Sequence, residues 1–154
     1  MVWPDDLISI ILAALLGAAI GLERELSRKP AGLRTNLLIC LGAAVFTIIS
    51  REMAMADGTE GAVTRIAAQV VTGVGFLGAG AIIQGRRGVH GLTSAATIWL
   101  VASIGMACGG QFYILAVVST LIAILTLLGL GKLSKTLDKY AKKSKSQNAQ
   151  YESE

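Results

Sequence analysis

Five long apolar segments, separated by short polar connections, constrain the fold of this chain more than any other feature. They run approximately over Leu7–Leu22, Leu33–Ser50, Ile66–Ile83, Leu92–Gly109 and Phe112–Gly131. Each is close to the roughly 20 residues with which an α-helix crosses the hydrocarbon core of a bilayer. Because lipid offers the backbone no hydrogen-bond partner, and because the alternation of a membrane β-strand is absent, we predict five transmembrane helices.

Composition supports the same class. The chain is 53% hydrophobic, which is too apolar for an ordinary soluble domain of 154 residues. The opening MVWPDD contains two acids and no basic residue, whereas a secretory signal begins with basic residues, so we expect the first segment to be retained. We predict an all-α membrane protein with one five-helix transmembrane domain over residues 1–131 and a polar, basic cytoplasmic tail over residues 132–154.

Lysine and arginine predict the orientation, because cytoplasmic loops are enriched in them. Twelve of the 14 basic residues lie in the first connection, the third connection and the tail, and only Arg51 and Arg65 lie on the other side. The N-terminus is therefore predicted outside and the C-terminus in the cytoplasm, in a multi-pass protein. The tail lysines fit either an anionic inner leaflet, which makes anionic lipids the expected lipid partners, or a solvated helix end.

The segment TGVGFLGAGAIIQG contains the G-x-G-x-x-G pattern of a dinucleotide-binding turn, at Gly73, Gly75 and Gly78. Such a turn follows a strand and has an acid about 20 residues further on, but here the next acid after Glu60 is Asp138. We therefore interpret these glycines as packing residues, because small side chains let membrane helices approach closely. Local unwinding of the third helix, with its carbonyls exposed to a cavity, is the alternative.

Small residues also recur at helical spacing in other segments. The residues that we assign to helix packing are Ala13, Gly17, Gly21, Gly73, Gly75, Gly78, Ala79 and Gly80. In the second segment, one face holds Asn36, Cys40, Ala43 and Thr47. Cys40 and Cys108 are interpreted as small packing residues, because two cysteines at this separation match neither a disulfide framework nor a metal-binding spacing.

Polar side chains gather at the predicted cytoplasmic edge, in GLERELSRKPAGLRTN and QGRRGVHGLTSAAT. The candidate site residues are Glu23, Arg24, Glu25, Arg34, Thr35, Asn36, Arg86, Arg87 and Thr93. We expect Glu25 to pair with Arg24 or Arg34. Arg86 and Arg87 would then be free for an anion, a phosphate headgroup or a partner protein. Thr93 or Ser94 is expected to cap the fourth helix. Ordinary interfacial anchoring is the alternative explanation of these residues.

Chemistry inside the bilayer is limited by the absence of acids from residues 61 to 137. A Mg²⁺ pathway usually supplies carboxylates, so a carboxylate-lined path is disfavoured. A path lined by backbone carbonyls and by the side chains of Asn36, Gln69 and Gln84 is the alternative. The single histidine, His90, and the two cysteines form no nucleophile–base set and no metal-binding pattern. The sequence therefore predicts a non-enzymatic protein with no metal, no cofactor and no nucleic-acid partner.

The stretches GLERELSRKPAGLRTNLLICLGAAVF and RIAAQVVTGVGFLGAGAIIQGRRGVHGLTSAATIWLVASIGMACG resemble the MgtC/SapB family of bacterial inner-membrane proteins. The resemblance implies a compact helical domain in the bacterial plasma membrane, with roles linked to Mg²⁺ limitation, virulence and control of other membrane proteins. Some members also have a soluble C-terminal ACT-type domain, and its functions are not expected here. The family's pattern falls on Gly21, Glu23, Arg24, Glu25, Gly32, Arg34, Thr35, Arg65, Gln69, Gly75, Gly78, Gly80, Gly91, Thr93, Ala95 and Ala96.

Two functions remain open at this point. The first is a non-enzymatic regulator whose small-residue faces pack against a partner, which could be a second copy in a homodimer or other homo-oligomer, a P-type pump or an ATP synthase subunit. The second is a transporter or channel for Mg²⁺ or another small ion. Five helices are few for a pathway, so such a transporter would act as an oligomer. A lipid-sensing protein is a weaker third possibility.

Overall fold

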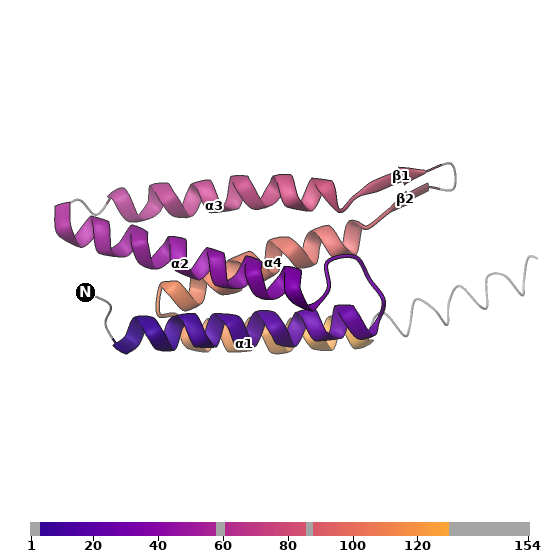
Figure 1. The fold of residues 1–154 in the computed structure, drawn as a ribbon, viewed down its shortest axis with the longest axis horizontal. Helices are drawn as coiled ribbons and strands as arrows, with labels where there is room; N and C mark the ends of the chain where they lie inside the picture. Colours follow the sequence, from indigo (N-terminus) through magenta and orange to yellow (C-terminus); the bar gives the residue numbers. More distant parts are fainter. Residues whose placement is uncertain (1–3, 58–60, 86–87, 130–154) are drawn as a thin grey trace, which may run out of the picture.

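The computed structural model describes residues 4–57, 61–85 and 88–129, which form a helical bundle with one short hairpin. In chain order the elements are α1 (Pro4–Leu26), α2 (Leu33–Asp57), α3 (Gly61–Gly80), β1 (Ile83–Gly85), β2 (Gly88–His90), α4 (Leu92–Gly109) and a fifth helix, Tyr113–Gly129. Figure 1 shows α3, α2 and α1 side by side, with α4 behind α2 and the fifth helix behind α1. The predicted all-α class is confirmed.

The bundle has two distinct ends. The turn between α1 and α2 and the β1–β2 hairpin lie at one of them, which we name the hairpin end (Figure 1). The beginnings of α1 and of the fifth helix lie at the other, which we name the N-terminal end. Both connections that were assigned to the cytoplasm therefore lie at the hairpin end. Which side of the membrane this end faces stays a prediction, and the tail lies outside the described residues.

Three helices of the described chain are long and apolar enough to cross a bilayer, namely α1, residues Leu33–Met55 of α2, and α4. Ala68–Gly80 within α3 and the fifth helix are shorter apolar helices. Length and composition thus fit a membrane protein. The prediction that all five segments cross is not tested by this structure.

The third apolar segment differs from its predicted bounds. The helix occupies Gly61–Gly80, not Ile66–Ile83, and Ile83 instead pairs with His90 in the antiparallel hairpin. Gly88 and Gly91 have φ angles of 120° and 91°, which suit glycine and let the chain turn within the hairpin and again into α4. α3 is a single continuous helix, so the alternative of local unwinding is wrong for this structure.

α2 is the central helix of the bundle and packs closely against glycines of α1. A Cβ atom added to Gly17 would lie 2.6 Å from Cys40 Cβ, and one added to Gly21 would lie 2.8 Å from Leu33 Cα. These separations are shorter than any ordinary carbon–carbon contact, so a larger residue would push the two helices apart. The glycine pair of the first segment therefore packs against α2 within the protomer.

α2 also packs against a second glycine pair, on α4. A Cβ atom added to Gly105 would lie 2.1 Å from Cys40 O, and one added to Gly109 would lie 2.5 Å from Ala44 O. This pair has the same four-residue spacing as Gly17 and Gly21, and our sequence analysis did not assign it to packing. Small residues on α1 and α4 thus let both helices pack closely against α2, as is common between membrane helices.

The middle of the bundle is apolar and tightly closed. Ala13 of α1, Cys40 of α2, Val101 of α4 and Ala116 of the fifth helix are fully buried in one hydrophobic cluster. α3 stands apart from this cluster, because between residues 68 and 80 only Val74 and Gly78 are buried. The core therefore joins α1, α2, α4 and the fifth helix, and α3 lies at its edge.

Candidate functional site

The hairpin end holds a buried ion pair between two consecutive residues of α1. Arg24 Nε donates a hydrogen bond to Glu23 Oε2 at 2.5 Å, and Ser27 Oγ donates one to Glu23 Oε1 at 2.8 Å. Only 8% of Glu23 and 3% of Arg24 are exposed. Arg24 follows Gly17 and Gly21 at helical spacing, so it lies on the face of α1 that packs against α2. The charge of Arg24 is thereby neutralised inside the protein.

Glu25 does not form the ion pair that the sequence suggested. Its Oε2 atom accepts a hydrogen bond from the backbone N–H of Leu33 at 3.0 Å, which satisfies a free donor at the start of α2. The carboxylate also occupies the space next to Gly32 that a Cβ atom would need. Arg34 and Thr35 are exposed. The expected pairing of Arg24 or Arg34 with Glu25 is therefore corrected: Arg24 pairs with Glu23.

Asn36 holds the turn between α1 and α2 and is fully buried. Its Nδ2 donates hydrogen bonds to Ala31 O and to Gly32 O, the second at 2.9 Å. Ala31 has a φ of 59°, a strained value for a residue with a side chain, so these bonds help to fix the turn. Among the described atoms, Asn36 Oδ1 has no hydrogen-bond partner. Asn36 is thus a buried structural residue next to the ion pair.

The predicted cap of α4 is wrong. The residue before the helix is Gly91, and no side chain of the described chain makes a cap hydrogen bond there. Thr93 is exposed, while Ser94 is buried one position further on. The hairpin brings the chain into α4 through a left-handed glycine, and this geometry leaves no position for a capping hydroxyl. Arg86 and Arg87 lie outside the described residues.

Gln69 and Gln84 do not come together within one protomer. Gln69 lies on α3, whereas Gln84 lies in the exposed strand β1, in the hairpin that extends beyond the bundle (Figure 1). Within one protomer the two amides thus lie on different elements, and their role in lining a path stays a prediction.

A second buried ion pair, at the N-terminal end, was not predicted. Arg51 of α2 forms an ion pair with Asp6 of α1, which is only 2% exposed. Arg51 Nη1 also donates a hydrogen bond to Gly109 O at 3.0 Å, so one guanidinium links α1, α2 and the end of α4. Asp6 precedes Ala13 and Gly17 on the same face of α1, and this spacing was the signal in the sequence.

The fifth helix joins the same polar cluster. Ser9 Oγ lies 3.0 Å from the hydroxyl oxygen of Tyr113, and each hydroxyl also lies within hydrogen-bonding distance of Asp5 O. Polar residues thus fasten the bundle at both ends, and the apolar cluster fills the space between them. In the part of the chain that the structure describes, no group of three or more His, Cys, Asp or Glu side chains is placed to hold a metal ion.

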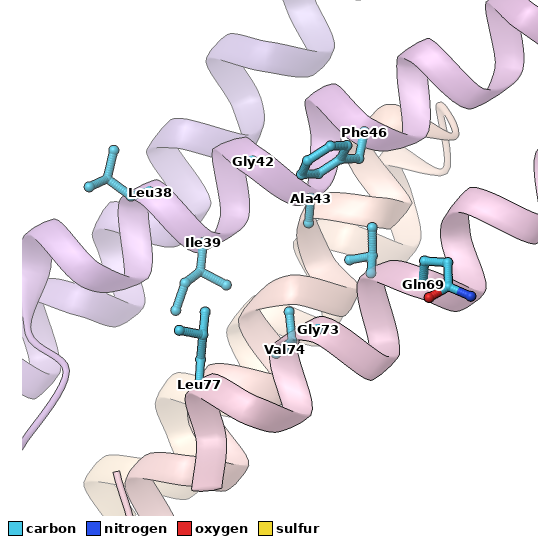
Figure 2. Close-up of a pocket in the computed structure, with 10 residues that line it drawn as sticks. Leu38, Ile39, Gly42, Ala43, Phe46, Gln69, Gly73, Val74 and Leu77 are labelled. Carbon is cyan, nitrogen blue, oxygen red and sulfur yellow. The ribbon is translucent and has the colours of Figure 1, made fainter. Parts of the chain in front are cut away.

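An apolar groove runs between α2 and α3, with a cavity volume of about 540 Å³. We name it the α2–α3 groove. α2 contributes Leu38, Ile39, Gly42, Ala43 and Phe46, and α3 contributes Gln69, Val70, Gly73, Val74 and Leu77. Figure 2 shows the apolar side chains of the two helices facing each other across the groove, with Gln69 at one end of it.

The glycines of α3 have open space around them, unlike those of α1 and α4. No atom lies within 4 Å of a Cβ atom added to Gly73, Gly75 or Gly80, and only Gly78 meets another helix, at Ala95 of α4. Ala79 is also exposed. Within one protomer, a Cβ atom at position 73, 75 or 80 would therefore meet no neighbouring helix.

The model of the MgtC family matches residues 10–136, which is most of the chain. The chain belongs to the MgtC family. No solved structure matches.

Several relatives of this MgtC-family protein are known by sequence. YhiD of Escherichia coli K12, named as a candidate magnesium transporter, is 45% identical over 127 residues, which are 80% of this chain and 59% of YhiD. Protein MgtC of Salmonella typhimurium 14028s is 50% identical over 107 residues, or 69% of this chain and 44% of MgtC. A Synechocystis protein, slr0014, is 37% identical over 134 residues, which are 87% of this chain and 56% of slr0014. The chain spans about half the length of these relatives.

The role of Glu25 in this MgtC-family protein can be tested by mutation. Glu25→Ala is expected to lower the free energy of unfolding by about 1 kcal/mol, because the Leu33 N–H loses its acceptor at the helix start. Denaturant titration of the purified protein in detergent would measure the loss. Arg34→Gln is the matched control and should lower the free energy of unfolding by less than about 0.5 kcal/mol, since Arg34 is exposed. Equal losses would mean that Glu25 and Arg34 form a pair after all.

Proposed function

We propose that this protein is a non-enzymatic accessory protein of the bacterial plasma membrane, which regulates other membrane proteins under Mg²⁺ limitation. Membership of the MgtC family supports the link to Mg²⁺, because relatives include MgtC and the magnesium-related YhiD. A role in virulence follows the same family resemblance.

The observation that carries the proposal is the closed apolar interior of the bundle. Fully buried Ala13, Cys40 and Val101 fill its middle, and the buried charges Glu23–Arg24 and Asp6–Arg51 lie at its two ends. Each of these charges has an opposite charge beside it. The Asp6–Arg51 pair links α1 to α2, and the Glu23–Arg24 pair neutralises two charges within α1. A closed interior of this kind supports the proposal of a scaffold that acts through its surface. The partners expected for it are a P-type pump or an ATP synthase subunit.

The name of YhiD favours a second candidate function, Mg²⁺ transport. Since Gln69 lines a groove on the outside of the apolar core, a path in this protein would have to run between copies of the chain and not through one bundle. Transport therefore predicts a flux that depends on Gln69 and on oligomerisation.

Mg²⁺ flux in proteoliposomes separates the two functions. With the purified protein, whose folding is verified by a cooperative thermal transition, we expect no Mg²⁺ entry above that of empty liposomes. Flux that depends on the protein and falls in the Gln69→Leu variant would reject the regulatory proposal and establish transport.

A growth experiment tests the positive side of the proposal. In a bacterial strain that lacks its own MgtC-family protein, expression of this chain is expected to restore growth at limiting Mg²⁺ without raising the rate of Mg²⁺ uptake. Glu23→Gln should reduce this rescue, because it leaves the buried Arg24 charge unpaired, whereas the exposed control Arg34→Gln should not. Rescue that is accompanied by faster Mg²⁺ uptake would contradict the proposal.

A further inference from the structure

The α2–α3 groove contains one side chain that its surroundings do not satisfy. Of the ten residues that line the groove, only Gln69 has a polar side chain. Among the described residues, its amide makes no hydrogen bond. Gln69 is exposed, and the inference rests on the proposed function, which places α3 in the membrane. In hydrocarbon an unpaired amide costs on the order of several kcal/mol, because no water is present to replace the missing bonds. The groove therefore favours an occupant that offers Gln69 both a donor and an acceptor.

Each wall of the groove contains a glycine, which leaves the helix backbone uncovered there. Gly42 on α2 and Gly73 on α3 line it, and no atom lies within 4 Å of a Cβ atom added to either. Glycine at such positions lets another membrane helix approach to backbone contact. A lipid acyl chain could fill the volume but could not pair with the amide. A helix with a polar group at the depth of Gln69 fits both observations.

We propose that the occupant is α3 of a second copy of this chain. Two copies inserted in the same orientation are related by a two-fold axis along the membrane normal, so that each residue lies at the same depth as its counterpart and residues beside the axis meet their own counterparts. A glutamine amide has both donors and acceptors, and the two Gln69 side chains can therefore bond to each other. Gly73 lies one turn further along α3 and allows the two helices to cross closely.

The exposure of α3 supports the same pairing. It is the helix at the edge of the core, and 82% of Phe76 and 49% of Leu77 are exposed on it. Leu77 lines the groove, and Phe76 lies next to it in the sequence. In the paired arrangement, these side chains of one copy would cover the groove of the other. The glycines of α1 and α4 are not available for this purpose, because α2 already packs against them.

Disulfide crosslinking in native membranes tests the proposed interface. Gly73→Cys is expected to form a disulfide-linked dimer when membranes are treated with copper phenanthroline, because a disulfide needs Cα atoms within about 7 Å of each other. Gly75→Cys is the matched control, since it has equally open surroundings but faces away from the groove, and it should stay monomeric. The unmodified chain shows how much crosslinking the two buried native cysteines, Cys40 and Cys108, give by themselves. Equal crosslinking at positions 73 and 75, or none at 73, would overturn the proposal.

The amide contact is tested by dimerisation in lipid nanodiscs or detergent, measured by fluorescence energy transfer between labelled copies. Gln69→Leu is expected to raise the dimer dissociation constant by about three- to tenfold, the range for a hydrogen bond between membrane helices. Gln69→Asn should retain part of the affinity, and all variants should match the unmodified protein in thermal unfolding. A monomer that keeps a bound lipid in native mass spectrometry, or one that crosslinks at position 73 only to a different protein, would overturn the second copy as the occupant.

Discussion

Gly105→Val is expected to lower the free energy of unfolding by about 3 kcal/mol or more, at the upper end of the range for overpacked cores. The first added carbon would lie 2.1 Å from Cys40 O and 3.0 Å from Ala43 Cβ. The nearest atom belongs to the backbone of a central helix and cannot rotate away, so α4 and α2 must separate. Their separation would also disturb the apolar cluster that both helices share.

The loss can be measured by denaturant titration in detergent and by the amount of protein that accumulates in the membrane. Gly75→Val is the matched control, with the same chemical change at a helical glycine that has no atom within 4 Å of an added Cβ. It should change the free energy of unfolding by less than about 0.5 kcal/mol. If both variants lose the same stability, the close packing of α4 on α2 is not what makes Gly105 necessary.

Arg51→Met is expected to lower the free energy of unfolding by about 3 kcal/mol or more, because it removes the positive charge that pairs with the buried carboxylate of Asp6. It also removes the hydrogen bond to Gly109 O that ties the end of α4 to α2. The free energy of unfolding is expected to recover in part when Asp6→Leu is added, since the double variant buries no charge.

The neighbouring Glu52 provides the control for this experiment. Its Oε1 atom lies 3.6 Å from Arg51 Nη2, but more than one-third of its side chain is exposed. Glu52→Gln should therefore change the free energy of unfolding by less than about 0.5 kcal/mol. A full double-mutant cycle of Asp6 and Arg51 would give the coupling energy between them. A coupling close to zero would show that the pair is a consequence of the helix packing and does not stabilise it.

Helical spacing identified which small residues share a face, but it did not show which helix covers that face. The same reasoning was applied to Gly17, which packs against α2, and to Gly73, where an added Cβ atom would have no other helix within 4 Å. Gly105 and Gly109 had the same spacing as the first pair and were overlooked. Spacing gives the direction of a side chain on its own helix, whereas close packing also depends on how the helices are arranged.

The partner of each charged residue also depends on how the helices are arranged, and not only on spacing along the chain. The residues Glu23, Arg24 and Glu25 are consecutive, and each points about 100° away from the previous one around the helix. Which acid meets Arg24, and which one reaches the start of α2, depends on where the turn places Leu33 and Asn36. The sequence located the polar cluster at this end of the bundle, but it assigned the partner of Glu25 wrongly.

By itself, the sequence determined that this is a helical protein with long apolar segments and that its family is MgtC, because segment length and local motifs are properties of neighbouring residues. Only the tertiary structure decided that α2 is central, that Asp6 pairs with Arg51 at a distance of 45 residues, and that α3 leaves a groove with an unpaired amide. The physical reason is that these features arise from contacts between helices. Such contacts depend on the mutual fit of whole surfaces, which no single segment contains.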